Sequence, residues 1–127
     1  MSSSPVEYFS LVNLTRGCIL ANRVRKARRF WERAKGLIGR SPLEEGEGLL
    51  IEPCAWIHTF GMAFLIDVLY LDDEGEVAHA CCSLRPNRLG PLIRRAHSVL
   101  ELPAGTIVRS GTKIGDRLEE RSIEATS

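Results

Sequence analysis

Residues 64–77, FLIDVLYLDDEGEV, carry the strongest structural signal in this chain. The run from Phe64 to Leu71 is apolar at both even and odd positions, which is typical of a β-strand covered on two sides. The Asp-Asp-Glu-Gly sequence after it predicts a tight turn, so that residues 76–83 return as an antiparallel strand. A turn centred on this sequence pairs Val68 with His79. We therefore expect a hairpin built around this core strand.

Weaker strand patterns lie on both sides of the hairpin. The sequence predicts strands at residues 8–14, 18–24, 49–51 and 98–102, an extended segment at 56–60, and a last strand that follows a tight turn at 113–118. The first two strands form a predicted hairpin of their own, because Gly17 between them can adopt a positive φ.

Helical periodicity is found at about residues 28–38. Five apolar residues there recur at the three- and four-residue spacing of one helix face: Phe30, Trp31, Ala34, Leu37 and Ile38. A short turn or helical segment is also expected after Pro103. About seven short strands and one α-helix at residues 28–38 predict a mainly β fold, either a compact closed barrel or a jelly-roll-like sandwich.

Length and composition indicate one domain. The chain has 127 residues, of which 44% are hydrophobic and 26% charged, and we expect a single domain over residues 1–127 with its core at about 8–120 and flexible ends. No apolar run reaches the length of a signal sequence or a membrane span, so we expect a soluble, cytoplasmic protein with no membrane partner. The four cysteines lack the spacing of a disulfide scaffold. The oligomeric state stays open.

Basic residues are concentrated between Arg16 and Arg40. This stretch holds nine Lys or Arg residues and a single acid, Glu32, although the net charge of the whole chain is only +1. Electrostatic binding to nucleic-acid phosphates is therefore one alternative function. A solvated helix face is the favoured interpretation, because no aromatic platform for bases accompanies the charges.

Asp67 lies inside the apolar core strand. A carboxylate there needs a hydrogen-bonding or charged partner, because desolvation makes its burial costly. One interpretation is a structural anchor, bonded to backbone amides or to Arg85, Arg88 or Arg94. The other is a general base or a ligand contact with a shifted pKa. We favour the anchor, since structural ion pairs also perturb buried carboxylates.

The WIHTFGM sequence at residues 56–62 is the best candidate for a binding site. His58 and Thr59 precede the bend at Gly61, where side chains can face the mouth of a cavity. The long connection at 85–95 is of the kind that often carries function. The candidate set for a small polar or anionic ligand is His58, Thr59, Asp67, Arg85 and Arg88. The alternative for His58 is a half-buried side chain bonded to a backbone carbonyl.

Three functions are open on these residues. The first is a ligand-binding or accessory β domain with a polar pocket near the WIHTFGM segment. The second is a hydrolase or transferase that uses His58 as a base assisted by Asp67, and the third is nucleic-acid binding. The chain shows no zinc-site spacing among its cysteines and histidines, so we expect no metal and no cofactor. Glu101, on an alternating strand, is expected to face solvent.

Five motifs occur in one order along the chain: FWERAKGLIGR at 30–40, GEGLLI at 46–51, WIHTFGMAFLIDVLYLDDEGEV at 56–77, VLELPAG at 99–105 and GTKIGDRL at 111–118. In this order they resemble the family called domain of unknown function 192, over about residues 10–119. The resemblance implies a compact, barrel-like or jelly-roll-like β domain with one helix, found in bacteria and archaea and without an established activity. Leu65 departs from the proline usual there, and Asn87 from a tryptophan often found in that segment.

Overall fold

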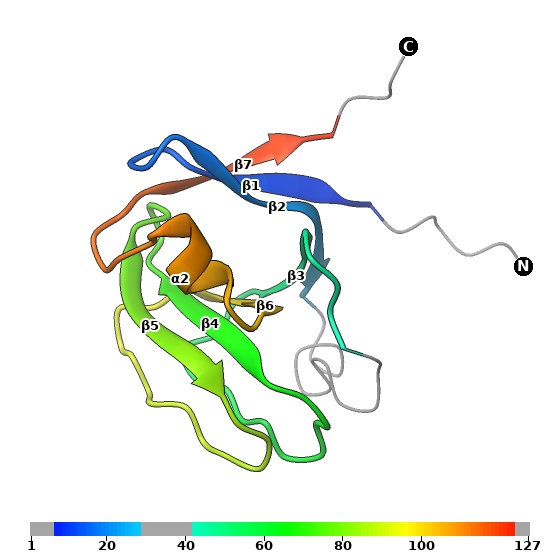
Figure 1. The fold of residues 1–127 in the computed structure, drawn as a ribbon. Coiled ribbons are helices and arrows are strands. Elements are labelled where there is room, and N and C mark those ends of the chain that lie inside the picture. The colour runs from blue at the N-terminus through cyan, green and yellow to red at the C-terminus, as the bar shows by residue number, and fades with distance from the viewer. Residues whose placement is uncertain (1–6, 29–41, 124–127) are drawn as a thin grey trace, which may run out of the picture.

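The computed structural model contains one seven-stranded β-sheet with the strand order β5-β4-β6-β3-β2-β1-β7, and it describes residues 7–28 and 42–123. The elements are β1 (Phe9–Asn13), β2 (Cys18–Ala27), β3 (Glu47–Ile51), β4 (Ile66–Leu71), β5 (Val77–Leu84), β6 (Ser98–Pro103), α2 (Thr106–Ser110) and β7 (Leu118–Ser122). The sheet curls into a half-barrel (Figure 1). The prediction of a mainly β fold with about seven strands is confirmed.

The predicted helix at residues 28–38 lies outside the described residues, except for Arg28, which follows the end of β2. Within the described residues, α2 is the one helix of the fold, at the place where a turn or helical segment was expected after Pro103. Ile107 of this helix packs into the core. In Figure 1 the helix lies against one face of the curled sheet.

The hairpin β4-β5 is present, but its predicted register is wrong by two residues. Val68 pairs with Cys81, and His79 pairs with Tyr70. The turn is longer than expected, because Leu71 pairs with Val77 and Glu76 stays within the turn, where its carbonyl accepts from the Asp72 amide at 2.9 Å. Glu76 also forms an antiparallel bridge with Arg117. A further register shift lies between Tyr70 and Leu71.

Strand β4 is buried along its whole length and separates two hydrophobic clusters. Leu69 and Leu71 face the cluster that includes Ile107 of α2. The residues of opposite parity face a second cluster, which includes Ile57 and Met62 from the connection after β3. The prediction of a strand covered on both sides is therefore confirmed, because α2 covers one face and the WIHTFGM segment the other.

The two edges of the sheet meet at one end of the half-barrel. The Val77 amide donates to the Asp116 carbonyl at 2.8 Å, and the Leu118 amide donates to the Gly75 carbonyl at 2.8 Å. These bonds join the start of β5 to the start of β7, the outermost strands in the sheet order. They hold the curl of the sheet closed on this side.

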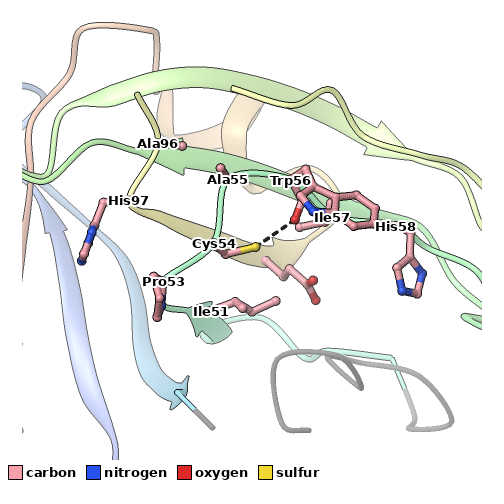
Figure 2. Close-up of a pocket in the computed structure, with 10 residues that line it drawn as sticks. Ile51, Pro53, Cys54, Ala55, Trp56, Ile57, His58, Ala96 and His97 are labelled. Carbon is pink, nitrogen blue, oxygen red and sulfur yellow. Dashed lines mark hydrogen bonds between the residues drawn. The ribbon is translucent and has the colours of Figure 1, made fainter. Parts of the chain in front are cut away.

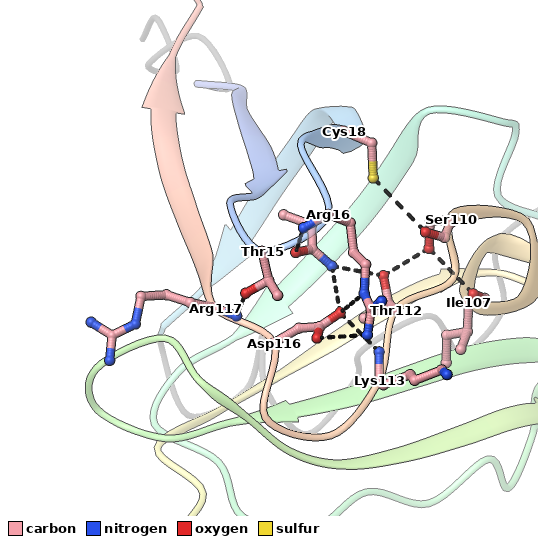
Figure 3. A network of polar contacts seen from close by, with 10 residues as sticks. Thr15, Arg16, Cys18, Ile107, Ser110, Thr112, Lys113, Asp116 and Arg117 are labelled. Carbon is pink, nitrogen blue, oxygen red and sulfur yellow. Dashed lines mark hydrogen bonds and ion pairs between the residues drawn. The ribbon is translucent and has the colours of Figure 1, made fainter.

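A partly buried polar network fastens the β1-β2 turn at the same end (Figure 3). Arg16 Nε donates to Asp116 Oδ2 at 2.8 Å, and Asn13 Nδ2 donates to the same oxygen at 3.0 Å. The Lys113 amide is a third donor to this oxygen. The Arg16 guanidinium, with these donors, lowers the pKa of Asp116 to about 2. The network joins residues about one hundred positions apart in the chain.

Candidate functional site

The WIHTFGM segment is held by a ladder of backbone hydrogen bonds to the connection that follows β5. The Ile57 carbonyl accepts from the Gly90 amide at 2.8 Å, and the Thr59 amide donates to the Arg88 carbonyl at 2.8 Å. His58 forms an antiparallel bridge with Leu89 between these bonds. The segment is thus extended, as the sequence predicts, and the two connections together cover one face of the sheet.

Side chains alternate along this extended segment. Ile57 and Thr59 are buried, whereas Trp56 and Phe60 are each 48% exposed. His58 lies between these two aromatic rings, 6.1 Å from the Trp56 ring centroid and 5.5 Å from that of Phe60. Its Nδ1 accepts a hydrogen bond from the Phe60 amide at 3.2 Å. His58 is half-buried and bonded to backbone, although to an amide and not to the carbonyl that its alternative interpretation predicts.

A cavity of about 640 Å³ lies between this segment and the sheet. It is lined by Ile51, Pro53, Cys54, Ala55, Trp56, Ile57, His58, Ala96, His97 and Glu101. Figure 2 shows Trp56, His58 and His97 around it, with the Cys54 thiol donating to the Trp56 carbonyl at 2.8 Å. Most of the lining is apolar, so the predicted polar character of the pocket is wrong.

Glu101 contributes the carboxyl group of this cavity. It pairs with Leu49 of β3 and Val68 of β4, and both of these side chains belong to the cluster under the WIHTFGM segment. Glu101 is only 2% exposed, and its Oε2 has no hydrogen-bond partner among the residues that the structure describes. Burial raises the pKa of Glu101 to about 8.

The prediction that Glu101 faces solvent is therefore wrong. Strand alternation correctly separates Glu101 from Leu100 and Leu102, but it does not say what covers each face. The cover comes from the connection after β3, which lies some 45 residues earlier in the chain than Glu101. A signal was nevertheless present, since both neighbours of Glu101 are apolar and β6 reads as a central strand.

Asp67 lies on the other face of the sheet, where it fastens α2 and β5. Its side chain is fully buried. Oδ2 accepts hydrogen bonds from the Ile107 amide at 2.8 Å and the Gly105 amide at 3.1 Å, and Oδ1 accepts one from the Ser83 amide at 2.8 Å. These three charge-assisted hydrogen bonds compensate for the cost of removing the carboxylate from water. The geometry is that of the structural anchor, with backbone amides as its partners.

Thr59 shapes the loop that contains Arg85 and Arg88. Its Oγ1 donates to the Arg85 carbonyl at 2.6 Å and accepts from the Arg88 amide at 2.8 Å. Thr59 is fully buried, whereas the side chains of Arg85 and Arg88 are exposed. None of the three is among the described residues that line the cavity. Ligand binding by these two arginines stays a prediction.

The five candidate residues do not form a single site. Of these five residues, His58 lines the cavity, whereas Asp67 lies on the opposite face of the sheet. The structure does not bring together the His58 and Asp67 pair that the predicted hydrolase or transferase requires, because Asp67 is bonded to α2 and β5 on one face of the sheet and His58 lines the cavity on the other. The alternation of side chains in β4 predicts which face of the sheet Asp67 occupies. It does not predict which face the segment that carries His58 covers.

Within residues 7–28 and 42–123, no cluster of three His, Cys, Asp or Glu side chains is arranged to hold a metal ion. The same residues include no helix with the length and apolar character needed to span a membrane. Three described cations of the basic stretch are paired with acids: Arg16 with Asp116 and Lys26 with Glu120, each at 2.8 Å, and Arg28 with Glu52 at 3.9 Å. Residues 29–40 of the stretch lie outside the described residues, and nucleic-acid binding stays a prediction.

Comparison with known proteins places this fold among uncharacterised relatives. The family model DUF192, described as "Uncharacterized ACR", matches residues 12–120. A UPF0127 protein of Thermococcus sibiricus is 34% identical, with 88% of this chain and 78% of the relative covered. A UPF0127 protein of Pyrococcus furiosus is 32% identical, with 86% of this chain and 96% of the relative covered.

Two solved structures share the fold. One is a protein of unknown function from Novosphingobium aromaticivorans, with a TM-score of 0.77, 25% identity, and 90% of this chain and 84% of that chain covered. The other is titled a putative transcription regulator from Sinorhizobium meliloti, with a TM-score of 0.78, 25% identity, and 94% of this chain and 97% of that chain covered. The regions matched in these two structures include nearly the whole half-barrel.

Proposed function

The chain belongs to the DUF192 family of uncharacterised proteins, and we propose that it is a small-molecule-binding domain whose site is the cavity between β6 and the WIHTFGM segment. The observation that carries this proposal is the buried carboxyl of Glu101, a residue of the cavity lining whose Oε2 has no hydrogen-bond partner among the described residues. A ligand that enters the cavity would supply the missing partner.

The energetic cost of this carboxyl supports the proposal. A buried polar group without a hydrogen bond costs about 1–3 kcal/mol or more, and native proteins retain few such groups. Leu49 and Val68, the cross-strand neighbours of Glu101, are both apolar. An apolar residue at position 101 would therefore suit the core better, which favours a role for Glu101 other than stability.

The cavity also has the character of a ligand site. Its volume of about 640 Å³ lies within the range of about 300–1,000 Å³ that is common for small-molecule pockets. Such pockets combine an apolar lining with a few polar groups, and here Glu101, His58 and His97 are the titratable groups among mostly apolar neighbours. Trp56, half exposed, offers an aromatic surface beside them.

A fragment screen by thermal shift tests the proposal. Compounds that occupy the cavity raise the melting temperature by mass action, by an amount equivalent to about 2.7 kcal/mol at a concentration one hundred times the Kd. The variant Ala96→Leu places a larger side chain in the cavity lining, and Ala63→Leu adds the same atoms at an exposed position. Compounds should stabilise the wild type and Ala63→Leu but not Ala96→Leu. A screen without hits, or hits that Ala96→Leu retains, would contradict the proposal.

A further inference from the structure

We propose that the ligand of this cavity carries a protonated nitrogen with at least one N–H, attached to an apolar body, and that Glu101 binds this nitrogen. This inference rests on the proposed function and specifies the chemical class of the ligand. It differs from the polar or anionic ligand that the sequence indicates, because an anion in this cavity would meet a carboxyl group.

The charges around Glu101 favour a cationic ligand. No lysine or arginine is among the described residues that line the cavity. The two histidines there already have partners, since His58 Nδ1 accepts from the Phe60 amide and His97 Nε2 lies 3.3 Å from Glu52 Oε1. The carboxylate form of Glu101 is therefore without a protein counter-ion in the described part of the chain. An ammonium or guanidinium group would supply both the charge and the hydrogen bond.

The unpartnered oxygen of Glu101 further restricts the chemical class of the ligand. Oε2 of Glu101 is only an acceptor when the group is ionised, so a ligand that pairs with the ionised form must present a donor hydrogen to it. Primary and secondary amines, amidines and guanidines do so when protonated, whereas quaternary ammonium groups do not. An aromatic ring alone would not distinguish protonated amines from quaternary ammonium groups, since cation–π attraction requires no N–H.

The rest of the lining accommodates an apolar body. Ile51 and Ile57 are buried at the cavity, and Ala96 packs against the same cluster. Trp56 presents a half-exposed ring at the side of His58, where it can contact a cation or an aromatic group of the ligand. The site thus pairs one buried charge with a mainly apolar contact surface.

Binding of a cation should release a proton from Glu101. Burial holds the pKa of this group at about 8, so its carboxyl is mostly neutral at pH 7 and must ionise to pair with the ligand. The other titratable groups facing the cavity are His58, His97 and Cys54. Affinity should rise between pH 6.5 and pH 8.5 in the wild type, and it should do so much less when Glu101 is replaced by glutamine.

The test uses four probes that share a 2-phenylethyl group and differ in the polar group attached to it. They are phenethylamine, 2-phenylethanol, 3-phenylpropionate and the N-trimethylated phenethylammonium ion. Titration calorimetry and NMR shifts of the Trp56 indole N–H measure binding to the wild type, Glu101→Gln and the exposed control Glu119→Gln. We expect phenethylamine to bind the wild type and Glu119→Gln at least tenfold more tightly than the other three probes. Glu101→Gln should weaken its binding at least tenfold.

The outcomes separate this inference from the proposed function. If all four probes bind equally well, and Glu101→Gln has no effect while Ala96→Leu abolishes binding, the cavity is a ligand site but the cationic class is wrong. Preference for 3-phenylpropionate or for the quaternary ion would also overturn the inference. Failure of every probe to bind would overturn it too, whereas the proposed function is judged by the broader fragment screen. Unfolding curves of Glu101→Gln are the control that this variant is folded.

Discussion

Asp67 and Glu101 are buried carboxyl groups on neighbouring strands that point to opposite faces of the sheet. Asp67 pairs with Leu102, and Glu101 pairs with Val68, so one residue separates the two positions in the β4-β6 register. Asp67 accepts three backbone hydrogen bonds. Oε2 of Glu101 accepts none from the described residues. The same residue chemistry thus serves stability on one face and ligand binding, as we propose, on the other.

Replacement of Asp67 by asparagine should destabilise the fold. The change removes the negative charge from three bonds and directs an amide NH₂ toward a backbone N–H, which should cost about 2–4 kcal/mol. Urea unfolding at pH 7 measures the loss. Asp73→Asn, at an exposed position in the β4-β5 turn, should change stability by less than about 0.5 kcal/mol. Equal effects of the two variants would show that Asp67 is not an anchor.

Replacement of Glu101 by glutamine should change how stability depends on pH. The folded pKa of about 8 lies above the ordinary value of 4.5. The stabilising effect of the neutral form is therefore complete below pH 4.5 and is lost as the pH rises through about 8. The slope is at most about 1.4 kcal/mol per pH unit. Glu101→Gln has no such proton, so it should be the more stable protein at pH 9.

Urea unfolding at pH 5, 7 and 9 checks this expectation. The difference between Glu101→Gln and the wild type should grow in favour of the variant as the pH rises. Glu119→Gln, on the exposed side of β7, should follow the wild type at each pH. Parallel curves for wild type and Glu101→Gln would mean that the Glu101 carboxyl is not the group that titrates.

Asp116 should show the opposite dependence on pH. Its folded pKa of about 2 lies below the ordinary value of 3.8, mainly because of the Arg16 guanidinium. The stabilisation is therefore present above pH 3.8 and is lost as the pH falls through about 2. Asp116→Asn should cost about 1–3 kcal/mol at pH 7, since it weakens the bonds to Arg16 and Asn13. The difference from wild type in urea unfolding should shrink between pH 4 and pH 2, and a constant difference would argue against the ion pair.

Replacement of Thr59 by valine should loosen the loop at residues 85–88. Valine has nearly the same shape but leaves the Arg88 amide and the Arg85 carbonyl without the hydroxyl, which should cost about 1–3 kcal/mol. Hydrogen exchange of the Arg88 amide should become faster, while binding in the cavity should be unchanged because Thr59 is not among its described lining residues. Wild-type protection of that amide would contradict the role given to Thr59.

Local patterns were sufficient to predict the fold class. The two-sided apolar run of β4 and the Asp-Asp-Glu-Gly turn predict the hairpin, and the backbone hydrogen bonds of Asp67 agree with the structural anchor that its place in this run favours. The register was not predictable from the hairpin alone. Glu76 forms a β-bridge with Arg117, about forty residues later in the chain, and no pattern within the hairpin contains this contact.

The site could be predicted in part. The WIHTFGM segment does line the cavity through Trp56 and His58. The sequence predicts a solvent-facing Glu101, because the alternation of β6 gives the direction of a side chain but not what covers it. Likewise, His58 and Asp67 lie within ten residues of each other in the chain, and only the path of the connection shows that the sheet separates them.

The position of β6 affects how the chain can fold while it is being synthesised. This strand lies between β3 and β4, although it follows both of them in the chain. Until the ribosome has released residues 98–103, β3 and β4 each have one unpaired edge, and β1 also waits for β7. Unpaired strand edges promote association with other chains. The sheet can therefore close only late in synthesis, and we expect the nascent protein to be a client of chaperones that bind extended segments.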